Sequence, residues 1–461
     1  MNRTDGSRRV VVIGGGLAGL QAAIACADDG AAVTLLEARP RLGGATWSTQ
    51  HRGLQVDNGQ HVFMRCCTAY RAFLDRIGAT DLTRLQPRLA VPVLVPGGPL
   101  GWIRRGAWPA PAHLVGSLLR FPGLPRAARL RTVRVASRLL ALDPGDPALD
   151  DSSMAEWLLA RGESRLAVDT LWDLLIRPTV NLPPAEASMA LAVKVLRTGF
   201  LDRADAADLG VPLVPLGELH AGPASEVLRK AGAEVRLRAP VEAIELVKGR
   251  VAGVRLADGR IAAEAVIVAT PHEAAAELLP DGSGVDRAAL HRLGRSPIVN
   301  LHVHLDRSVL DRPFVATVGS ELQWVFDRTA PSGAERGQVL AVSLSSADAY
   351  LGESSESLRA RFLPELERLF PAVRGARVLD WFTTREPAAT FRQRPGTAAL
   401  RPRAATRIPG LAVAGAWTAT GWPATMEGAV RSGHAAAAAV LGSLHAESAA
   451  PAPSGRTGRA A

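Results

Sequence analysis

A glycine-rich turn between two apolar segments constrains the fold of this chain more than any other sequence feature. Residues 9–13 (RVVVI) have the β-branched, apolar character of a buried parallel strand, and residues 33–37 (VTLLE) predict a second strand. Between them, Gly14, Gly16 and Gly19 open an apolar helical segment. The first glycine permits a tight turn, the second lets the backbone approach a pyrophosphate, and the third lets the helix pack closely on the strand. This order of elements predicts a dinucleotide-binding unit.

The residues that would contact the dinucleotide follow from this arrangement. Leu17 and Ala18 lie at the start of the helix, where free amides and the helix dipole favour a pyrophosphate. Glu37 ends the second strand, where a carboxylate can accept hydrogen bonds from a ribose hydroxyl. The alternative is a turn in a parallel sheet that binds no ligand, but the flanking strands, the helix and the terminal acid together favour binding.

A basic loop and a glycine pair follow Glu37. Arg39 and Arg41 precede Gly43 and Gly44. This continuation resembles the FAD-binding start of the amine oxidase and phytoene desaturase superfamily, and the resemblance implies FAD as the dinucleotide. A second glycine motif is absent from the sequence, so we do not expect a separate NAD(P)H domain.

Composition places the chain among ordinary globular proteins. Its 461 residues are enough for two domains, and 47% hydrophobic with 21% charged residues exclude a mainly disordered protein. The net charge is +10, but no recognition module for nucleic acid accompanies it, so we expect no nucleic-acid partner. The three cysteines match neither a metal-ligand spacing nor a disulfide framework, and no apolar run reaches the ~20 residues of a membrane-spanning helix. We therefore expect a reduced, cytoplasmic setting.

Later segments predict how the domains are divided. Residues 265–270 (AVIVAT) read as a buried strand returning to the parallel sheet, and residues 411–430 read as a strand, a loop and a helix with Pro423 near its start. We predict an α/β fold, with a Rossmann-type FAD-binding domain and an inserted mixed α+β substrate domain. The FAD-binding domain is assigned residues 1–90, 205–275 and 385–445, the substrate domain 91–204 and 276–384, and a disordered tail 446–461.

Two segments of the predicted substrate domain have distinct characters. Residues 101–140 contain eight arginines and no acid, together with Trp102, Trp108 and several leucines. Such a segment suits an interfacial helix on anionic lipid, at the inner face of the membrane, although a solvated basic face is equally compatible with it. Residues 165–177 predict an apolar helix that ends before Pro178, and we interpret this region as a substrate-binding layer or as ordinary core.

Polar side chains with possible chemical roles are few. Gln60 and His61 follow a short predicted strand and are candidates for lining an active site, with structural roles as the alternative. His302 and His304 share one face of a predicted strand, as a metal-binding pair would. Because the sequence offers no third ligand, we interpret these two histidines as packing or surface residues and predict no metal site.

Three blocks of sequence identify a closer resemblance. Residues 56–61 (VDNGQH), 385–391 (REPAATF) and 417–433 (WTATGWPATMEGAVRSG) are similar to those of the hydroxysqualene dehydroxylases, the squalene-associated FAD-dependent desaturase group of bacterial hopanoid pathways. The resemblance implies a reductive dehydroxylation of hydroxysqualene, an apolar isoprenoid, to squalene. It places the following residues at FAD: Gly14, Gly16, Leu17, Ala18, Gly19, Glu37, Arg39, Arg41, Gly43, Gly44, Val241, Gly415, Trp417 and Met426. The electron donor is not identified by the sequence.

The leaving hydroxyl needs a proton, for which we consider His61 the donor, with Asp57 orienting its loop. Two positions depart from the wider superfamily, which often has Arg where this chain has Ala45 and an acid where it has Ala416. The alternative reaction is oxidative chemistry on the same fold, by a carotenoid-type (phytoene) desaturase or an amine oxidase. A non-enzymatic alternative is a lipid-binding protein without flavin, similar to the GDP-dissociation inhibitors.

Overall fold

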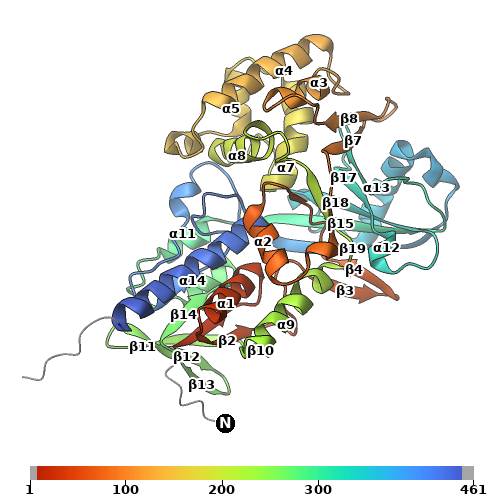
Figure 1. Cartoon of the computed structure of the whole chain (residues 1–461). Helices are drawn as coiled ribbons and strands as arrows, with labels where there is room; N and C mark the ends of the chain where they lie inside the picture. Colours follow the sequence, from red (N-terminus) through yellow and green to blue (C-terminus); the bar gives the residue numbers. More distant parts are fainter. Residues whose placement is uncertain (1–7, 449–461) are drawn as a thin grey trace, which may run out of the picture.

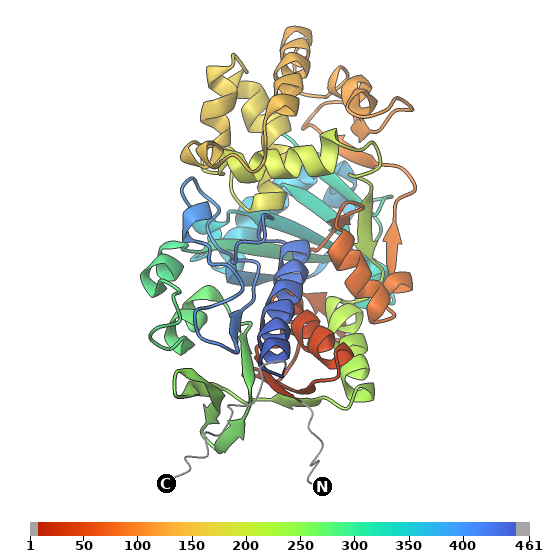
Figure 2. The ribbon, with the colours of Figure 1, turned by 60° about the vertical axis from the view of Figure 1, so that its left-hand side comes forward.

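The computed structural model describes residues 8–448, whose elements form three layers (Figure 1, Figure 2). A parallel sheet with its helices lies at the bottom of Figure 2, a mixed sheet lies in the middle, and a group of helices caps the top. The two lower layers meet where the parallel strands end, and this meeting point positions the candidate site.

The bottom layer is built on a five-stranded sheet in which every neighbouring pair is parallel. Its strands, in spatial order, are β10 (Glu234–Leu237), β2 (Ala32–Glu37), β1 (Arg9–Ile13), β14 (Ala265–Val268) and β20 (Leu411–Val413). The strand β1 lies in the centre and is buried from Val10 to Ile13, as its apolar sequence predicts. The predicted α/β class with a Rossmann-type sheet is confirmed.

Both faces of this sheet are covered. One face packs against α1 (Leu17–Asp28), α14 (Met426–Ser448) and α9 (Gly222–Lys230), with α2 (Thr68–Arg76) completing the layer. The other face packs against α10 (His272–Leu278), α11 (Arg287–Arg292) and an antiparallel sheet of β11 (Val241–Val247), β12 (Arg250–Leu256) and β13 (Gly259–Ala262). Alternate residues of β1 point to the two faces, so Val10 and Val12 join the first core and Val11 and Ile13 the second.

The middle layer is a seven-stranded mixed sheet. Its order is β19 (Val378–Thr390), β15 (Ser296–Leu305), β18 (Gln338–Ser345), β17 (Trp324–Asp327), β16 (Phe314–Thr317), β7 (Ala90–Leu94) and β8 (Gly101–Arg104). The odd-numbered residues Val299, Leu301 and Val303 of β15 pack with α13 (Ser355–Leu369). Asn300 and His302 therefore lie on the opposite face of β15.

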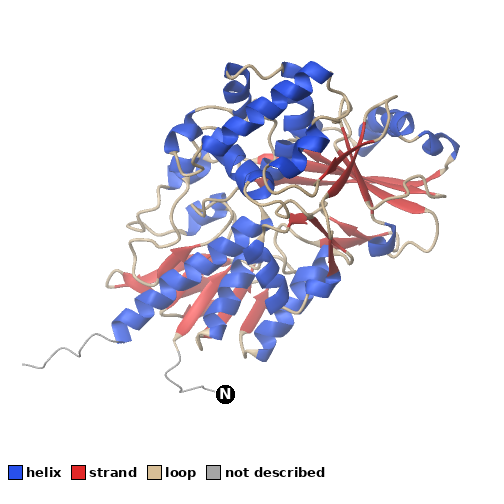
Figure 3. Cartoon of the chain, turned by 45° about the horizontal axis from the view of Figure 1, so that its top comes forward, coloured by secondary structure: helices blue, strands red, loops and turns tan. Residues whose placement is uncertain are grey.

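The cap consists of short helices around a separate apolar core, seen in blue at the top of Figure 3. They are α3 (Val115–Leu118), α4 (Arg126–Arg138), α5 (Met154–Ala160), α6 (Arg165–Ala167), α7 (Asp173–Val180) and α8 (Met189–Leu196). Wide π-helical turns at Val168–Trp172 and Arg197–Leu201 extend α6 and α8. Smaller sheets join the layers: β3 (Ser48–His51) with β4 (Leu54–Asp57), and β5 (Phe63–Met64) with β9 (Leu209–Pro212) and β6 (Thr83–Leu85).

The structure differs from the sequence predictions in several places. The helix predicted to end before Pro178 continues to Val180, because burial of Ile176 and Val180 outweighs the loss of one backbone donor at the proline. Residues 276–293, assigned from sequence to the substrate domain, carry the end of α10 and all of α11 and pack on the parallel sheet. Residues 385–390, assigned to the FAD-binding domain, complete β19 of the mixed sheet. Of the predicted tail 446–461, residues 446–448 complete α14 and 449–461 lie outside the described residues.

Candidate functional site

In the turn between β1 and α1, Gly14 and Gly19 leave no room for a side chain, whereas Gly16 does. Gly14 has φ +107°, and a Cβ there would lie 2.6 Å from the Ala269 carbonyl oxygen. A Cβ on Gly19 would lie 1.8 Å from the Gly14 carbonyl oxygen, so close packing of α1 requires glycine. A Cβ on Gly16 would meet only the Gly44 Cα, at 3.6 Å, and its φ of −77° is ordinary. The protein itself therefore leaves space at Gly16, next to the first amides of α1.

Glu37 and the glycine pair hold this turn in place. One Glu37 carboxylate oxygen accepts the amide of Gly15 at 2.7 Å and the other accepts the amide of Arg39 at 2.8 Å. The amide of Gly43 donates to the carbonyl of Gly15 at 2.8 Å. A carboxylate has further lone pairs beyond these two bonds, so Glu37 can also accept from a ribose hydroxyl.

The predicted residues from later in the chain converge on the same strand ends. The Trp417 indole donates to the carbonyl of Thr270 at 3.0 Å, directly after β14, and the Gly415 amide donates to Ser432 Oγ at 2.8 Å. Met426 begins α14, so its helix N-terminus is directed at this region. Val241 begins β11 and follows Ala239, whose amide donates to the Glu37 carbonyl at 2.9 Å.

These residues fit a dinucleotide. The space at Gly16 lies at a helix N-terminus of the kind that binds pyrophosphate. Two buried polar atoms in the same region, Arg41 Nε and Thr270 Oγ1, have no hydrogen-bond partner among residues 8–448. Buried groups of this kind are normally satisfied, and a dinucleotide bound here would offer them acceptors. The Arg41 guanidinium also stacks on Trp47, with its carbon 4.0 Å from the ring centroid.

Ala45 and Ala416, the two positions that depart from the superfamily, each accept a hydrogen bond through the backbone carbonyl. Asn58 Nδ2 donates to the carbonyl of Ala45 at 2.9 Å. The guanidinium of Arg401, which is buried, donates to the carbonyls of Ala416 at 3.1 Å and Trp422 at 2.8 Å. Arg401 thus organises the loop before α14, a role that sequence reasoning missed, because its partners are main-chain atoms that leave no side-chain pattern.

Asp57 ties three segments together at the base of the loop that carries His61. Its two carboxylate oxygens accept from Ser48 Oγ at 2.6 Å, from the Leu216 amide at 2.9 Å and from Arg328 at 2.7 Å. Asp57 and Arg328 are both largely buried, so the ion pair has little screening by solvent. The carboxylate is fully engaged in holding the loop, which suits the predicted orienting role rather than proton transfer.

His61 lies at the end of this loop with a buried Nδ1 that makes no hydrogen bond to residues 8–448. Burial lowers the pKa of His61 below its usual value, although the nearby Asp57 carboxylate and the backbone of Gly59, which the ring faces, act in the opposite direction. The imidazole is therefore neutral at neutral pH. Behind it, His220 and the Tyr70 hydroxyl form a buried 2.7 Å hydrogen bond, and burial lowers the pKa of His220 to about 3.

The mixed sheet supplies the opposite wall through side chains. Asn300 Nδ2 and Thr384 Oγ1 both donate to the carbonyl of Asn58, at 2.8 and 3.1 Å. Glu386 accepts from Trp47 Nε1 and Asn58 Nδ2, each at 3.0 Å. Sequence reasoning quoted Glu386 only within a motif and missed Asn300, for which the available signal was one amide inside a buried apolar strand.

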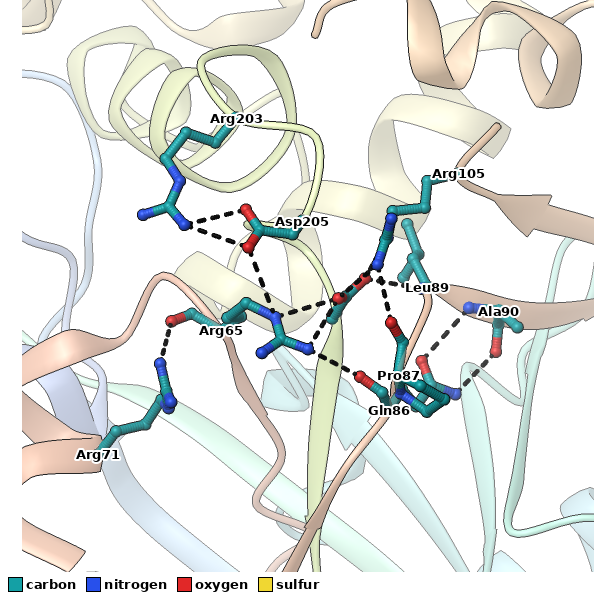
Figure 4. A network of polar contacts seen from close by, with 10 residues as sticks. Arg65, Arg71, Gln86, Pro87, Leu89, Ala90, Arg105, Arg203 and Asp205 are labelled. Carbon is teal, nitrogen blue, oxygen red and sulfur yellow. Dashed lines mark hydrogen bonds and ion pairs between the residues drawn. The ribbon is translucent and has the colours of Figure 1, made fainter. Parts of the chain in front are cut away.

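A second polar network fixes the chain that follows His61. Asp208, which is fully buried, accepts from Arg105 at 2.7 Å, from Arg65 at 3.1 Å and from the Leu89 amide at 2.7 Å. Figure 4 shows Arg65, Arg105 and Leu89 converging in this network. Arg105 follows β8 and Arg65 follows β5, so the network connects the cap side of the molecule with the segment leading from His61 to α2.

His302 and His304, considered above as a possible metal pair, contact an aromatic ring, a hydroxyl and a backbone carbonyl. His302 stacks on Phe382 at 4.7 Å and its Nε2 lies 3.1 Å from the Thr384 hydroxyl, while His304 Nε2 lies 3.0 Å from the Arg336 carbonyl. Within residues 8–448, three or more His, Cys, Asp or Glu side chains do not gather as a metal ion would require. In the same part of the chain, no helix is both long enough and apolar enough to cross a membrane.

Comparisons with known proteins agree with this arrangement. A family model described as flavin containing amine oxidoreductase matches residues 17–441. The hydroxysqualene dehydroxylase of Sinorhizobium fredii is 30% identical over 440 residues, which cover 93% of this chain and 97% of that protein. A protein of the same name from Rhodopseudomonas palustris is 28% identical, with 94% and 99% covered. A zeta-carotene desaturase of Synechocystis is 25% identical, with 94% and 97% covered.

A solved structure shares the same fold. Putrescine oxidase bound to putrescine superposes with a TM-score of 0.71 at 20% sequence identity, covering 95% of this chain and 99% of that one.

Proposed function

Because the chain belongs to the flavin-containing amine oxidoreductase family and, within it, to the hydroxysqualene dehydroxylase group, we propose that it converts hydroxysqualene to squalene. The protein is an FAD-dependent oxidoreductase. When bound and reduced, FAD supplies a hydride, which replaces the hydroxyl group of the substrate. The protein must then bind an apolar chain, exclude water and deliver one proton to the leaving oxygen.

The observation that carries this proposal is the 30% identity to a hydroxysqualene dehydroxylase over 93% of the chain. A small apolar cavity among the helices of the cap is compatible with an apolar substrate. The cavity has a volume of ≈ 50 Å³. Its lining is apolar except for Ser117: Ile103, Leu114, Leu118, Ala136, Leu139, Leu171, Trp172, Leu175, Leu196, Phe200 and Leu201. Both π-helical turns of the cap contribute to this lining, and turns of this type are frequent at functional sites.

The cavity is connected to the candidate site through packed apolar side chains. Met64 lies three residues after His61, and a Cβ on Gly199 would lie 3.1 Å from its Cε. Gly199 is part of the π-helical turn whose Phe200 and Leu201 line the cavity. For an isoprenoid chain to extend from the cap towards His61, these packed apolar side chains would have to move apart.

His61 is the proton donor in this proposal. Its Nδ1 is free of protein partners in residues 8–448, and its loop is held by the Asp57–Arg328 ion pair. Protonation of a buried imidazole is unfavourable, so the proton is readily given up once it is acquired.

The proposal is tested by product analysis under anaerobic conditions. The FAD-loaded protein, reduced with dithionite, is mixed with hydroxysqualene, and the extracted lipids are analysed by gas chromatography and mass spectrometry. We expect squalene in an amount equal to the flavin reoxidised. Unchanged hydroxysqualene with flavin that stays reduced would contradict the proposal.

A desaturase activity is the second candidate, because a relative named zeta-carotene desaturase also aligns over 94% of this chain. Desaturation removes hydride from the substrate, so it would reduce oxidised flavin instead of consuming reduced flavin. Incubating the oxidised holoenzyme with phytoene separates the two, since only a desaturase bleaches the flavin absorbance.

We further propose peripheral contact with an anionic membrane at the inner face, through the segment 101–140. Trp108 is 72% exposed and Leu130 is 64% exposed. They lie among exposed arginines at 104, 120, 126, 131, 134 and 138. Exposed apolar side chains among cations suit a lipid headgroup region. Flotation with anionic vesicles tests this contact, and full recovery in the vesicle-free fraction would contradict it.

A further inference from the structure

Asn300 holds a polar atom that the protein leaves unsatisfied. Its side chain is 0% exposed, and its Nδ2 donates to the Asn58 carbonyl at 2.8 Å. Because the partner is a carbonyl oxygen, the amide orientation is fixed and Oδ1 must face the other way. Asn300 Oδ1 is buried and has no hydrogen-bond partner among residues 8–448. An acceptor left in this state costs free energy unless a ligand or water satisfies it.

The same place holds the unsatisfied nitrogen of His61. A Cβ on Gly59 would lie 3.7 Å from Asn300 Nδ2 and 3.8 Å from His61 Nδ1. The Asn300 amide, through its nitrogen, and the His61 ring therefore both lie beside Gly59, although they belong to β15 and to the loop after β4. Asn300 Oδ1 is the other atom of the same amide group. Thr384, opposite Asn300 in the strand pairing, fixes the same Asn58 carbonyl from the neighbouring strand.

An acceptor and a potential donor at one position are complementary to a hydroxyl group. A hydroxyl has one hydrogen to donate and lone pairs with which to accept. We propose that Asn300 and His61 together bind the hydroxyl of the substrate, with Asn300 Oδ1 accepting its hydrogen and His61 Nδ1–H donating to its oxygen. This inference rests on the proposed function and deepens it, since it assigns a specificity-determining residue to the reaction.

The arrangement accounts for the fate of the leaving group. The proton comes from His61 in its protonated form, which is left as a neutral imidazole after the transfer. It passes to the hydroxyl oxygen, the electron pair of the carbon–oxygen bond leaves with that oxygen as water, and the carbon would take the hydride that reduced FAD supplies. Asn300 exchanges no proton, and it holds the hydroxyl in the orientation that receives one. The hydrocarbon product cannot satisfy Oδ1, so a site built in this way prefers the alcohol to the product.

Binding to the oxidised holoenzyme tests the inference without turnover, because no hydride is available. Hydroxysqualene and squalene are titrated in the same detergent, and the perturbation of the flavin absorbance gives a Kd for each. We expect the wild-type protein to bind the alcohol about tenfold more tightly than the hydrocarbon. In Asn300→Leu the two Kd values should become equal within about twofold, with squalene binding retained.

His304→Gln is the matched control, because it changes a polar side chain of the same strand that contacts the Arg336 carbonyl, away from Asn58 and Gly59. It should keep the wild-type preference for the alcohol. Asn300→Ser serves if the leucine variant does not fold, and it should also lose the preference. If the Asn300 variants keep the wild-type ratio, the inference is wrong while the proposed function stands. If the wild-type holoenzyme binds hydroxysqualene no better than squalene, the inference is also wrong. If reduced wild-type enzyme forms no squalene, the proposed function itself is wrong.

Discussion

The nucleotide side of the candidate site is shaped mainly by backbone, whereas the mixed-sheet side presents polar side chains. On the first side, the packing at Gly14 and Gly19 admits no Cβ, and Glu37 binds main-chain amides. On the second side, Asn300 and Thr384 reach across from paired strands to the loop that carries His61. The comparison teaches that the residues proposed to bind the cofactor are set by local chain conformation, while those proposed for substrate chemistry are brought together by the pairing of distant strands.

The largest expected effect comes from a methyl group in the first turn. In Gly19→Ala the new carbon would lie 1.8 Å from a carbonyl oxygen, so we expect a loss of at least about 3 kcal/mol in the free energy of unfolding. Gly16→Ala is the control, because its new carbon meets nothing closer than 3.6 Å. It should fold like the wild type as apoprotein but bind FAD more weakly, as measured by thermal unfolding and flavin titration. Equal stability of the two variants would show that the backbone argument is wrong.

The second-largest effect on stability is expected at the Asp57–Arg328 ion pair, which links the nucleotide side of the site to the mixed sheet. Arg328→Met leaves the buried Asp57 carboxylate without its cation, and we expect a loss of about 3 kcal/mol in the free energy of unfolding, measured by urea denaturation. The double variant Asp57→Asn, Arg328→Met should recover part of the loss, because the uncompensated charge is removed. A single variant as stable as the wild type would argue against a structural ion pair at this place.

Removing the imidazole should affect the reaction more than the fold. In His61→Gln we expect kcat to fall about a hundredfold, with FAD binding unchanged. Because the pKa of His61 is lowered, kcat/KM of the wild type should fall about tenfold per pH unit above that pKa, and the variant should lack this slope. Steady-state rates between pH 5 and 8 provide the measurement, and normal turnover in His61→Gln would exclude the assignment.

The smallest effect concerns the outer surface of the cap. Replacing Arg131 and Arg134 with Gln should weaken binding to anionic vesicles by about 1 kcal/mol per arginine. Arg359→Gln with Arg374→Gln, also exposed but distant in sequence, should leave vesicle binding unchanged. Equal losses in both double variants would indicate a general charge effect instead of a defined surface.

The same comparison explains what could be predicted from the sequence. The strands around the first turn and Glu37 were predictable because glycine spacing and β-branched runs act over a few residues. The role of Asn300 could not be predicted, because it depends on strand pairing with Thr384 and on a hydrogen bond to Asn58, both far away in sequence. The helix end predicted before Pro178 was wrong, because burial of Ile176 and Val180 in the tertiary structure outweighs the local effect of proline. The domain boundaries near 276 and 385 shifted for a similar reason, as helices and strands joined the sheets that could bury them.

The packing of α14 on α1 has a consequence for biosynthesis. A Cβ on Gly433 would lie 2.3 Å from the Ala18 carbonyl oxygen, so the two helices touch directly, and Ser432 holds the Gly415 amide. The ribosome makes α1 about four hundred residues before α14. Until then the apolar face of α1 lacks its partner, and the strand β20 is missing from the sheet edge. We therefore expect cofactor loading to follow synthesis of residues 411–448, and we expect the nascent chain to be prone to aggregation until then.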